Sequence, residues 1–373
     1  MTKLAPSRYD VVGSFLRPER LKKARAQHAA GAIDDAALTA IENECIAELI
    51  EKQKAAGLPF ITDGELRRSY WHLDFMWGLG GIEHIELDHG YFFVGEETTK
   101  GSAILTGKVT GENHPFIEHF RFVQQFEDEN HTAKQTVPAP AQLLLELYRN
   151  DAAIERVRAI YPDEDELLED IAAAYRTFIG EIHKAGCRNL QFDDCTWGIL
   201  VDERYWKGRR SGDPSETAEA EKYLRLNNLS LEGKPEDMVI TTHVCRGNYH
   251  STYASSGPYD AIAPFLFSRE NTDAFYLEFD DERSGGFEPL KYVPAGKKVV
   301  LGLITTKRPE LEDRETVIAR IHEAAKIVPL ENLCLSPQCG FASCEIGNKL
   351  TEDEQWAKVA LVKSIAEEAW GGR

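Results

Sequence analysis

A histidine and a cysteine stand two residues apart in the segment TTHVCRGN (241–248), at the end of an apolar run. Side chains on an extended segment alternate between two faces, so His243 and Cys245 point to one face and can reach a single ion. No other cysteine lies at the CxxC spacing of a local zinc knuckle. The pair therefore indicates half of a metal site whose other half lies elsewhere in the chain.

Two further residues at the ends of apolar runs would complete a set of four. Glu278 ends the run AFYLE, and Cys339 follows NLCLSP. One nitrogen, two sulfur and one oxygen donor suit tetrahedral zinc, and their wide separation in the chain favours an active site. Zn²⁺ with two thiolates and one carboxylate has a net charge of about −1, so it is a weak Lewis acid that leaves a captured thiolate nucleophilic. The chemistry favoured is attack by a thiol on an alkyl carbon, and not hydrolysis.

A simpler interpretation of these residues stays open. Cysteine is among the residue types most often buried in cores, so Cys245 and Cys339 could be packing residues. Glu278 lies within EFDDER and could belong to a solvated acidic loop. The metal site therefore depends on a fold that brings these segment ends together.

Short apolar runs alternate with amphipathic helical patterns, which predicts βα units and a parallel sheet. Helices are expected after Asp34 and at 164–185, 313–327 and 351–369, and the eight expected strands are residues 9–14, 59–64, 134–139, 189–194, 238–244, 274–280, 297–304 and 332–337. This order favours an α/β fold of the (β/α)8 TIM barrel type, whose functional residues lie at the carboxyl ends of the strands. A doubly wound open sheet is the alternative, but no GxGxxG follows the first strand.

We expect one domain over residues 1–373 with a single β-rich excursion at 78–133, between the second and third strands. The excursion contains the β-like stretches IEHIELDHGYFFV and SAILTGKVTG. It is predicted to be a β-hairpin insertion. Two roles are open for it: a lid over the site, or a contact between the subunits of a homodimer.

Charge and cysteine content disfavour several classes of partner. The formal net charge of −19 argues against nucleic acid and against an anionic membrane surface. No apolar stretch has the length of a signal peptide or a membrane span. The seven cysteines are few and odd in number, so reduced thiols in a cytoplasmic protein are expected.

Six segments resemble the cobalamin-independent methionine synthase family, in the form of its C-terminal catalytic barrel standing alone. VVGSFLRP, DGELRR and LQFDD are similar to the family's I-G-S-F-P, H-G-E and I-Q-I-D-E. THVC, YLEFD and LSPQCG are similar to its T-H-M-C, I-S-I-E and N-P-D-C-G. Because these motifs run in the same order and spacing from residue 12 to residue 340, the resemblance covers nearly the whole chain.

The resemblance implies that a Zn²⁺ ion activates a small-molecule thiol, homocysteine, for methylation to methionine. The ligands that it implies are the four residues already singled out, His243, Cys245, Glu278 and Cys339. The amino-acid group of homocysteine would be held by the residues that match the family's substrate segments, namely Gly13, Ser14, Glu65 and Asp193.

These substrate assignments agree with simple chemistry. A backbone N–H and a hydroxyl suit a carboxylate, and two acids suit an ammonium. Each acid also has a structural alternative. Asp193 could cap a helix beside Asp194, and Glu65 could form a surface pair with Arg67 or Arg68.

Two departures from the family concern the methyl donor. Full-length members carry a second, N-terminal barrel that helps to hold polyglutamyl folate, and these 373 residues contain none. Members also have a histidine after the seventh strand, thought to protonate the departing folate, where this chain reads GLITTKRPELED. Lys307 takes that position and is the predicted catalytic proton donor, with a solvated surface lysine as the alternative. A folate, a methylated corrinoid and another small methyl compound all stay open as donors.

Two other functions are compatible with the residues. One is a zinc-dependent alkyltransferase of the epoxide-opening type that acts on a small sulfonated thiol, although Glu65 and Asp193 would repel a sulfonate. The other is a non-catalytic relative that binds zinc or a thiol. Homocysteine methylation is favoured because the two acids suit an amino-acid thiol.

Overall fold

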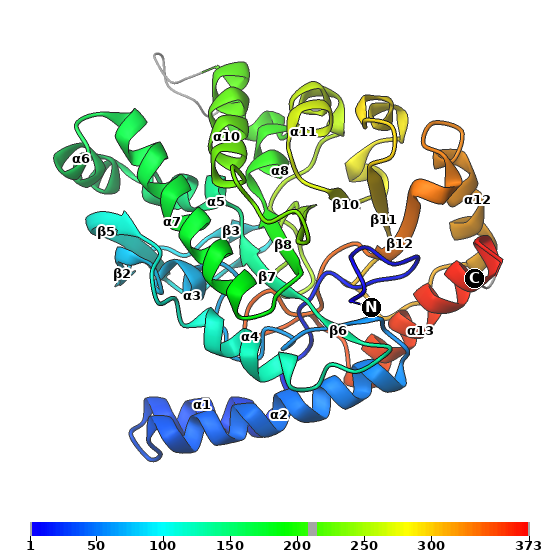
Figure 1. Ribbon diagram of the computed structural model, residues 1–373, viewed down its shortest axis with the longest axis horizontal. Helices are drawn as coiled ribbons and strands as arrows, with labels where there is room; N and C mark the ends of the chain where they lie inside the picture. The colour runs from blue at the N-terminus through cyan, green and yellow to red at the C-terminus, as the bar shows by residue number, and fades with distance from the viewer. Residues whose placement is uncertain (1, 208–214, 372–373) are drawn as a thin grey trace.

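The computed structural model describes residues 2–207 and 215–371, and its centre is a parallel sheet (Figure 1). The sheet has six strands in the order β12–β11–β10–β9–β8–β7 within the described residues. They are β7 (Gln135–Pro138), β8 (Asn189–Asp194), β9 (Val239–Val244), β10 (Ala274–Glu278), β11 (Lys298–Ile304) and β12 (Leu333–Pro337). Nearly every residue of these strands is buried, as expected for parallel strands that are covered on both faces.

A second parallel pair continues this sheet on the β7 side. Strand β1 (Phe60–Ile61) pairs with β6 (Thr132–Ala133), and β6 is separated from β7 by Lys134 alone. The backbone N–H of Lys134 donates to the carbonyl of Ile61 at 2.9 Å, so the pairing extends past β6. Seven of the eight expected strands therefore have a counterpart in the described residues.

The prediction of a regular strand at residues 9–14 is wrong. Tyr9 forms an isolated parallel bridge with Leu335 of β12, and beyond it the ladder stops. Side chains replace the missing strand partners. The carbonyl of Val11 accepts from Nζ of Lys134 (2.6 Å), and that of Val12 accepts from Nε2 of Gln191 (2.9 Å). The carbonyl of Gly13 accepts from Oγ1 of Thr62 (2.9 Å). The segment thus runs between β12 and β1 without being hydrogen-bonded as a strand, and no closed barrel is assigned.

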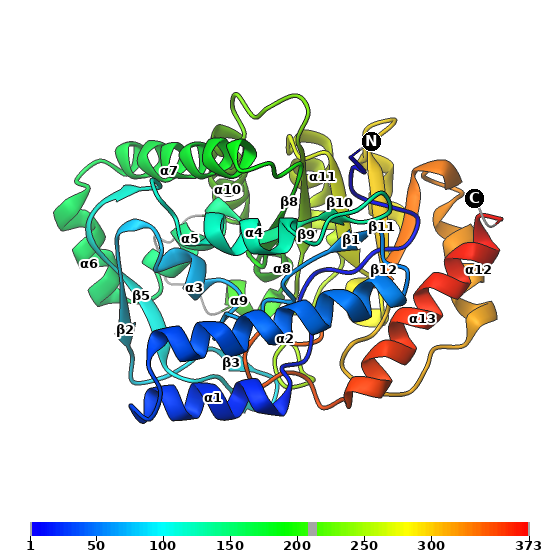
Figure 2. The ribbon, with the colours of Figure 1, turned by 60° about the horizontal axis from the view of Figure 1, so that its bottom comes forward.

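Helices surround the sheet, and the four predicted helices are present (Figures 1 and 2). They are α2 (Asp35–Ala55), α7 (Glu164–Lys184), α12 (Arg314–Ala324) and α13 (Glu352–Ala369). The carboxylate of Asp34 caps α2 by accepting from the N–H of Ala37. Thr351 and Glu354 form a capping box at the start of α13.

The remaining helices are mostly short and lie in the connections. The α-helices are α1 (Glu19–Ala29), α3 (Leu73–Met76), α4 (Phe116–Gln124), α5 (Pro140–Leu147), α6 (Asp151–Ile160), α8 (Thr196–Leu200), α9 (Glu203–Lys207), α10 (Glu216–Ser230) and α11 (Ala263–Arg269). Single 3₁₀ turns are η1 (Tyr259–Ala261), η2 (Glu282–Ser284), η3 (Glu288–Tyr292) and η4 (Leu330–Asn332). None of the helices that the structure describes is long and apolar enough to cross a membrane.

The region 78–133 contains two antiparallel strand pairs, and the longer pair lies at one end of the molecule (Figure 2). Strand β2 (Gly80–Glu86) pairs with β5 (Gly101–Thr110), and the short β3 (Phe92–Phe93) pairs with β4 (Glu96–Glu97). The predicted bounds are too wide for a purely β-rich excursion, because helix α4 and strand β6 also fall within them. Strand β5 packs against α6 and α7, so this region is joined to the main body.

Candidate metal centre and substrate cavity

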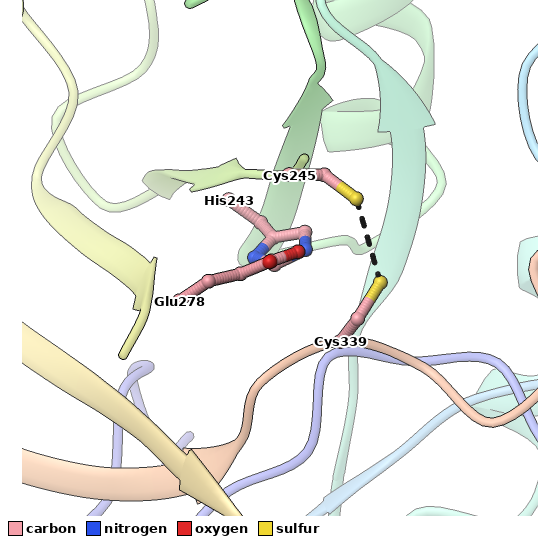
Figure 3. Close-up of side chains that lie close together, drawn as sticks. All are labelled: His243, Cys245, Glu278 and Cys339. Atoms are coloured by element: carbon pink, nitrogen blue, oxygen red, sulfur yellow. Dashed lines mark hydrogen bonds between the residues drawn. The ribbon is translucent and has the colours of Figure 1, made fainter. Parts of the chain in front are cut away.

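The four predicted metal ligands lie together at the carboxyl ends of three strands (Figure 3). His243 belongs to β9, Glu278 is the last residue of β10, and Cys245 and Cys339 lie just beyond β9 and β12. One ligand atom from each residue lies within 4.8 Å of all the others, and all four residues are buried. Segments up to 96 positions apart (243 to 339) thus converge on one point.

The geometry fits a tetrahedral ion. The sulfurs of Cys245 and Cys339 are 3.6 Å apart, close to the roughly 3.8 Å that two Zn–S bonds of about 2.3 Å give at the tetrahedral angle. Neither ring nitrogen of the buried His243 has hydrogen-bond geometry with any residue that the structure describes. A buried imidazole without partners is costly unless a ligand completes it, so these residues fit a zinc ion.

Glu278 is held ionised by the groups around it. Its Oε1 accepts from the backbone N–H of Arg246 at 3.1 Å, and its Oε2 accepts from Nη2 of Arg283 at 3.0 Å. Burial alone would raise the pKa of Glu278, but the cations Lys307, Arg283 and Arg246 outweigh it and lower that pKa to about 2. The carboxylate therefore brings a full negative charge to the centre.

Lys307 lies beside the centre but not on the cavity wall. Of the cations near Glu278, Lys307 has the largest effect on the pKa of that carboxyl, and it also lowers the pKa of Asp280 against the raising effect of burial. Its Nζ is buried and has no hydrogen-bond partner among the described residues. The surface-lysine alternative does not describe this buried Nζ, whose charge acts on Glu278 and Asp280.

A cavity of about 860 Å³ opens onto the metal ligands. Its wall contains His243, Cys245 and Cys339, together with three of the predicted substrate residues, Ser14, Glu65 and Asp193. Gly13 lies directly behind Glu65, since a Cβ at Gly13 would be 3.6 Å from Glu65 Oε1 and would collide with Thr136 at 2.7 Å. Six of the predicted site residues therefore line one cavity.

Two buried carboxylates face this cavity. Oε1 of Glu65 accepts from Thr136 at 2.8 Å, and its Oε2 is buried without a partner among the described residues. Asp193 accepts from Nε2 of Gln191 at 2.7 Å. Burial raises the pKa of both carboxyls, and the negative charge of Glu65 raises that of Asp193 further. Such a pair favours a cationic ligand group that would offset the repulsion.

Asp193 does not cap a helix, and Glu65 does not form a surface ion pair, which were the structural alternatives for these two acids. The carboxylate of Asp194, and not that of Asp193, accepts from the N–H of Thr196 at the start of α8. Glu65 has an ion pair with Arg68 at 3.5 Å, but both side chains are almost fully buried. Arg67 pairs instead with Glu42.

Several residues around the site gave no usable signal in the sequence. Arg283 stands within EFDDER, which also fitted a solvated loop, yet its guanidinium binds Glu278. Cys195 is a third thiol on the cavity wall, close enough to Cys245 to affect the pKa of that thiol. Tyr91 and Phe93 come from the 78–133 region, for which a lid over the site was one of the two open roles.

Comparison with known proteins gives a consistent result over the whole chain. A family model described as the catalytic domain of cobalamin-independent synthase matches residues 9–367. The uncharacterised protein YxjH of Bacillus subtilis (strain 168) is 43% identical over 372 residues, covering 98% of this chain and 95% of that protein. YxjG of the same strain, also uncharacterised, is 40% identical over 370 residues, covering 99% of this chain and 96% of that protein.

Solved structures show the same relationship. The crystal structure of a putative vitamin-B12-independent methionine synthase from Listeria monocytogenes has 40% identity and a TM-score of 0.78, and the match covers 99% of this chain and all of that one. The structure of a B12-independent methionine synthase from Shewanella sp. W3-18-1 in complex with selenomethionine has 18% identity and a TM-score of 0.71. The match covers 98% of both chains and shows the shared fold. On the family match and the close relatives, the chain belongs to the cobalamin-independent synthase catalytic-domain family.

Proposed function

We propose that this protein is a zinc-dependent methyltransferase that methylates homocysteine to methionine. The observation that carries the proposal is one cavity whose wall holds both the sulfur and nitrogen ligands of the metal group and the carboxylates of Glu65 and Asp193. A substrate that carries both a thiol and an ammonium group would place its sulfur at the metal ligands and its ammonium at the two carboxylates. The family match supports the same activity.

The ion's contribution is limited to the thiol: when bound, Zn²⁺ would lower the pKa of the substrate thiol and keep it as a nucleophilic thiolate near neutral pH. The residues around it do the rest. Glu65 and Asp193 would accept hydrogen bonds from the substrate ammonium, and Ser14 with its neighbouring backbone would receive the carboxylate. These contacts would hold the sulfur beside the ligand group and direct it toward the donor.

The cavity has room for a second substrate. Its volume of about 860 Å³ is near the upper end of the usual range for ligand sites, whereas an amino-acid thiol is small. Aromatic residues Tyr91, Phe93 and Tyr148 line part of the wall. Of the three arginines on the wall, Arg149 and Arg204 are paired with carboxylates, and Arg246 donates to the carbonyl of Gly257. The aromatic side chains suit a flat or apolar part of a methyl donor. Lys307 remains the proposed source of a proton for a leaving group that needs one, and its side chain would have to turn from Glu278 toward the cavity to deliver it.

The chain is also proposed to be one (β/α)8 barrel domain. The bridge of Tyr9 to β12, together with the hydrogen bond from the N–H of Phe15 to the carbonyl of Gly64 at 3.0 Å, connects the two edges of the parallel sheet through residues 8–15. Closure through this irregular segment would explain why its carbonyls are satisfied by side chains.

A donor panel tests the proposed activity. The purified protein, with zinc content measured, is offered homocysteine and in turn methyltetrahydrofolate, a methylated corrinoid and simple methyl sulfonium or amine compounds, and methionine is quantified. The same panel is run with 2-mercaptoethanesulfonate. Methionine formation at stoichiometric zinc supports the proposal. Alkylation of the sulfonated thiol alone, or zinc binding without turnover of any donor, would contradict it and favour the alkyltransferase or the non-catalytic relative.

A further inference from the structure

Two buried asparagines connect the loops that carry the cysteine ligands. Nδ2 of Asn248 donates to the carbonyl of Gly340 at 2.6 Å, one residue after Cys339. Nδ2 of Asn348 donates to Oδ1 of Asn248 at 2.9 Å and to the carbonyl of Thr306 at 2.8 Å. Loops that follow β9, β11 and β12 thus meet at two side-chain amides, which we call the amide clasp.

The orientation of the clasp is fixed by backbone groups. Oδ1 of Asn348 accepts from the backbone N–H of Ser251 at 2.9 Å, so its Nδ2 must face the Thr306 carbonyl. The second proton on that nitrogen then faces Oδ1 of Asn248, which directs Nδ2 of Asn248 toward Gly340. Exchanging the amide oxygen and nitrogen of either asparagine would place a donor against a donor or an acceptor against an acceptor, so neither amide can be flipped without losing hydrogen bonds.

The clasp acts where the backbone is under strain and tightly packed. His250 and Ser251 have φ of +45° and +69°, a region that costs free energy for residues other than glycine. A Cβ at Gly340 would lie 1.8 Å from Oγ of Ser14, so the Cys339 loop approaches the cavity wall closely. Asn248 and Asn348 are only 4% and 6% exposed, so their bonds are shielded from water.

We infer that Asn248 and Asn348 are positioning residues for the metal centre: the clasp holds the Cys245 and Cys339 loops so that the two sulfurs stand at ligand separation. The cysteine loops follow strands that are not neighbours, because β10 and β11 lie between β9 and β12. The sheet ladder therefore does not set the distance between these loops, and the clasp supplies the cross-connection. The inference rests on the proposed zinc site.

The structure offers a matched control for this arrangement. Asn228 also bridges two segments with both ends of its amide, donating to the carbonyl of Arg269 at 3.0 Å and accepting from the N–H of Asn271 at 2.9 Å. It lies on α10 and is not part of the cavity wall among the described residues. Asn228→Ala removes two side-chain contacts to the backbone, as Asn348→Ala does, without touching the cysteine loops.

The test compares Asn248→Ala, Asn348→Ala and Asn228→Ala with the unaltered protein. Zinc affinity is measured by competition with a chromogenic chelator, the absorption of the Co²⁺-substituted protein reports its thiolate ligands, and thermal unfolding of the metal-free protein reports general stability. Both clasp variants should bind zinc about 10- to 100-fold more weakly, the range typical of residues that orient metal ligands. Their cobalt–thiolate absorption should also change, whereas Asn228→Ala should keep both properties of the unaltered protein.

Thr306→Val serves if a clasp variant does not fold. It keeps the side-chain shape and removes the hydrogen bonds of Oγ1: those it donates to the Gly340 carbonyl (2.9 Å) and Oε1 of Gln338 (3.2 Å), and the one it accepts from Nδ2 of Asn348 (3.4 Å). The carbonyl contacts of both asparagines stay, so a smaller loss of zinc affinity is expected. Unchanged affinity and cobalt spectra in the folded variants, while the unaltered protein binds zinc tightly, would overturn the inference alone. An unaltered protein that binds no zinc would overturn the proposed function and this inference with it.

Discussion

Replacing Asp193 by asparagine should weaken the selection of an amino-acid thiol and, at the same time, stabilise the protein in the absence of substrate. Asp193 and Glu65 are buried carboxylates on one wall, and after burial the charge of Glu65 is the main cause that raises the pKa of Asp193. A hydrogen bond between a carboxylate and an ammonium contributes about 1.5–3 kcal/mol. Its loss corresponds to a fall of roughly 10- to 150-fold in kcat/KM for homocysteine.

The gain in stability has a definite dependence on pH. Because folding raises the pKa of Asp193, the folded state binds a proton more tightly than the unfolded state, and stability falls as the pH rises above the unfolded pKa. Asparagine has no proton to lose. The difference in unfolding free energy between Asp193→Asn and the unaltered protein should therefore grow in favour of the variant as the pH rises.

The assay compares homocysteine with 4-mercaptobutanoate, which keeps the thiol and carboxylate but lacks the amino group. The unaltered protein should prefer homocysteine, and Asp193→Asn should lose most of that preference. Asp194→Asn is the control, because Asp194 is buried beside Asp193 but binds Thr196 and Asn227. An equal loss of kcat/KM with both thiols in Asp193→Asn would refute the placement of the ammonium at this carboxylate.

Three further changes have expected outcomes. Cys339→Ser should lose both zinc and activity, and stoichiometric zinc in that variant, measured by metal analysis, would contradict the ligand set. Lys307→Met should not weaken zinc binding in chelator competition, because this cation repels a metal ion and its removal makes the Glu278 carboxylate more basic; turnover should be lost only for donors whose leaving group needs a proton, and an equal loss with every donor would contradict Lys307 as the acid. Glu270→Gln should stabilise the protein above about pH 8, since burial and Asp194 raise the pKa of Glu270 to about 8 and stability falls as pH rises toward that value. Urea unfolding at pH 5 and pH 9 measures this gain, which is at most about 4 kcal/mol, and an equal stability difference at both pH values would rule it out.

The sequence predicted the elements whose patterns are long or fully buried. Strand β8 matches its expected bounds of 189–194, and the apolar stripe of Ile171, Phe178 and Ile182 on α7 is buried as its spacing required. Helix α10 was not predicted, because its short apolar pattern is interrupted by polar residues that find partners only in the folded chain. Helix α12 ends three residues before the expected 327, in a turn.

The convergence of the four candidate ligands was predicted better than the loops around them. Strand ends fix the direction of His243 and Glu278, so their convergence follows once the strands lie side by side. The direction of Lys307 depends instead on a loop, in which Glu312 accepts from the N–H of Thr305 and pairs with Lys358. No local pattern encodes such contacts. The matching family position alone did not show that the Nζ of this lysine is buried and that its charge acts on Glu278.

The absence of a regular first strand and the form of the substrate site have one physical cause. A strand at residues 9–14 would use its N–H and carbonyl groups in ladders, whereas the observed segment leaves Val12 and Ser14 on the cavity wall and Gly13 beside Glu65. The backbone of Glu65 nearby has φ of +59°, a conformation that costs about 1–3 kcal/mol. Two hydrogen bonds hold it: its N–H donates to the carboxylate of Asp63 (2.8 Å), and its carbonyl accepts from Arg17 (2.7 Å). Regular pairing at this edge would align the backbone but close the space that the proposed substrate needs. The sheet is therefore expected to stay irregular here in relatives that keep a glycine and a serine at these positions, and regular pairing in a relative that has them would contradict this explanation.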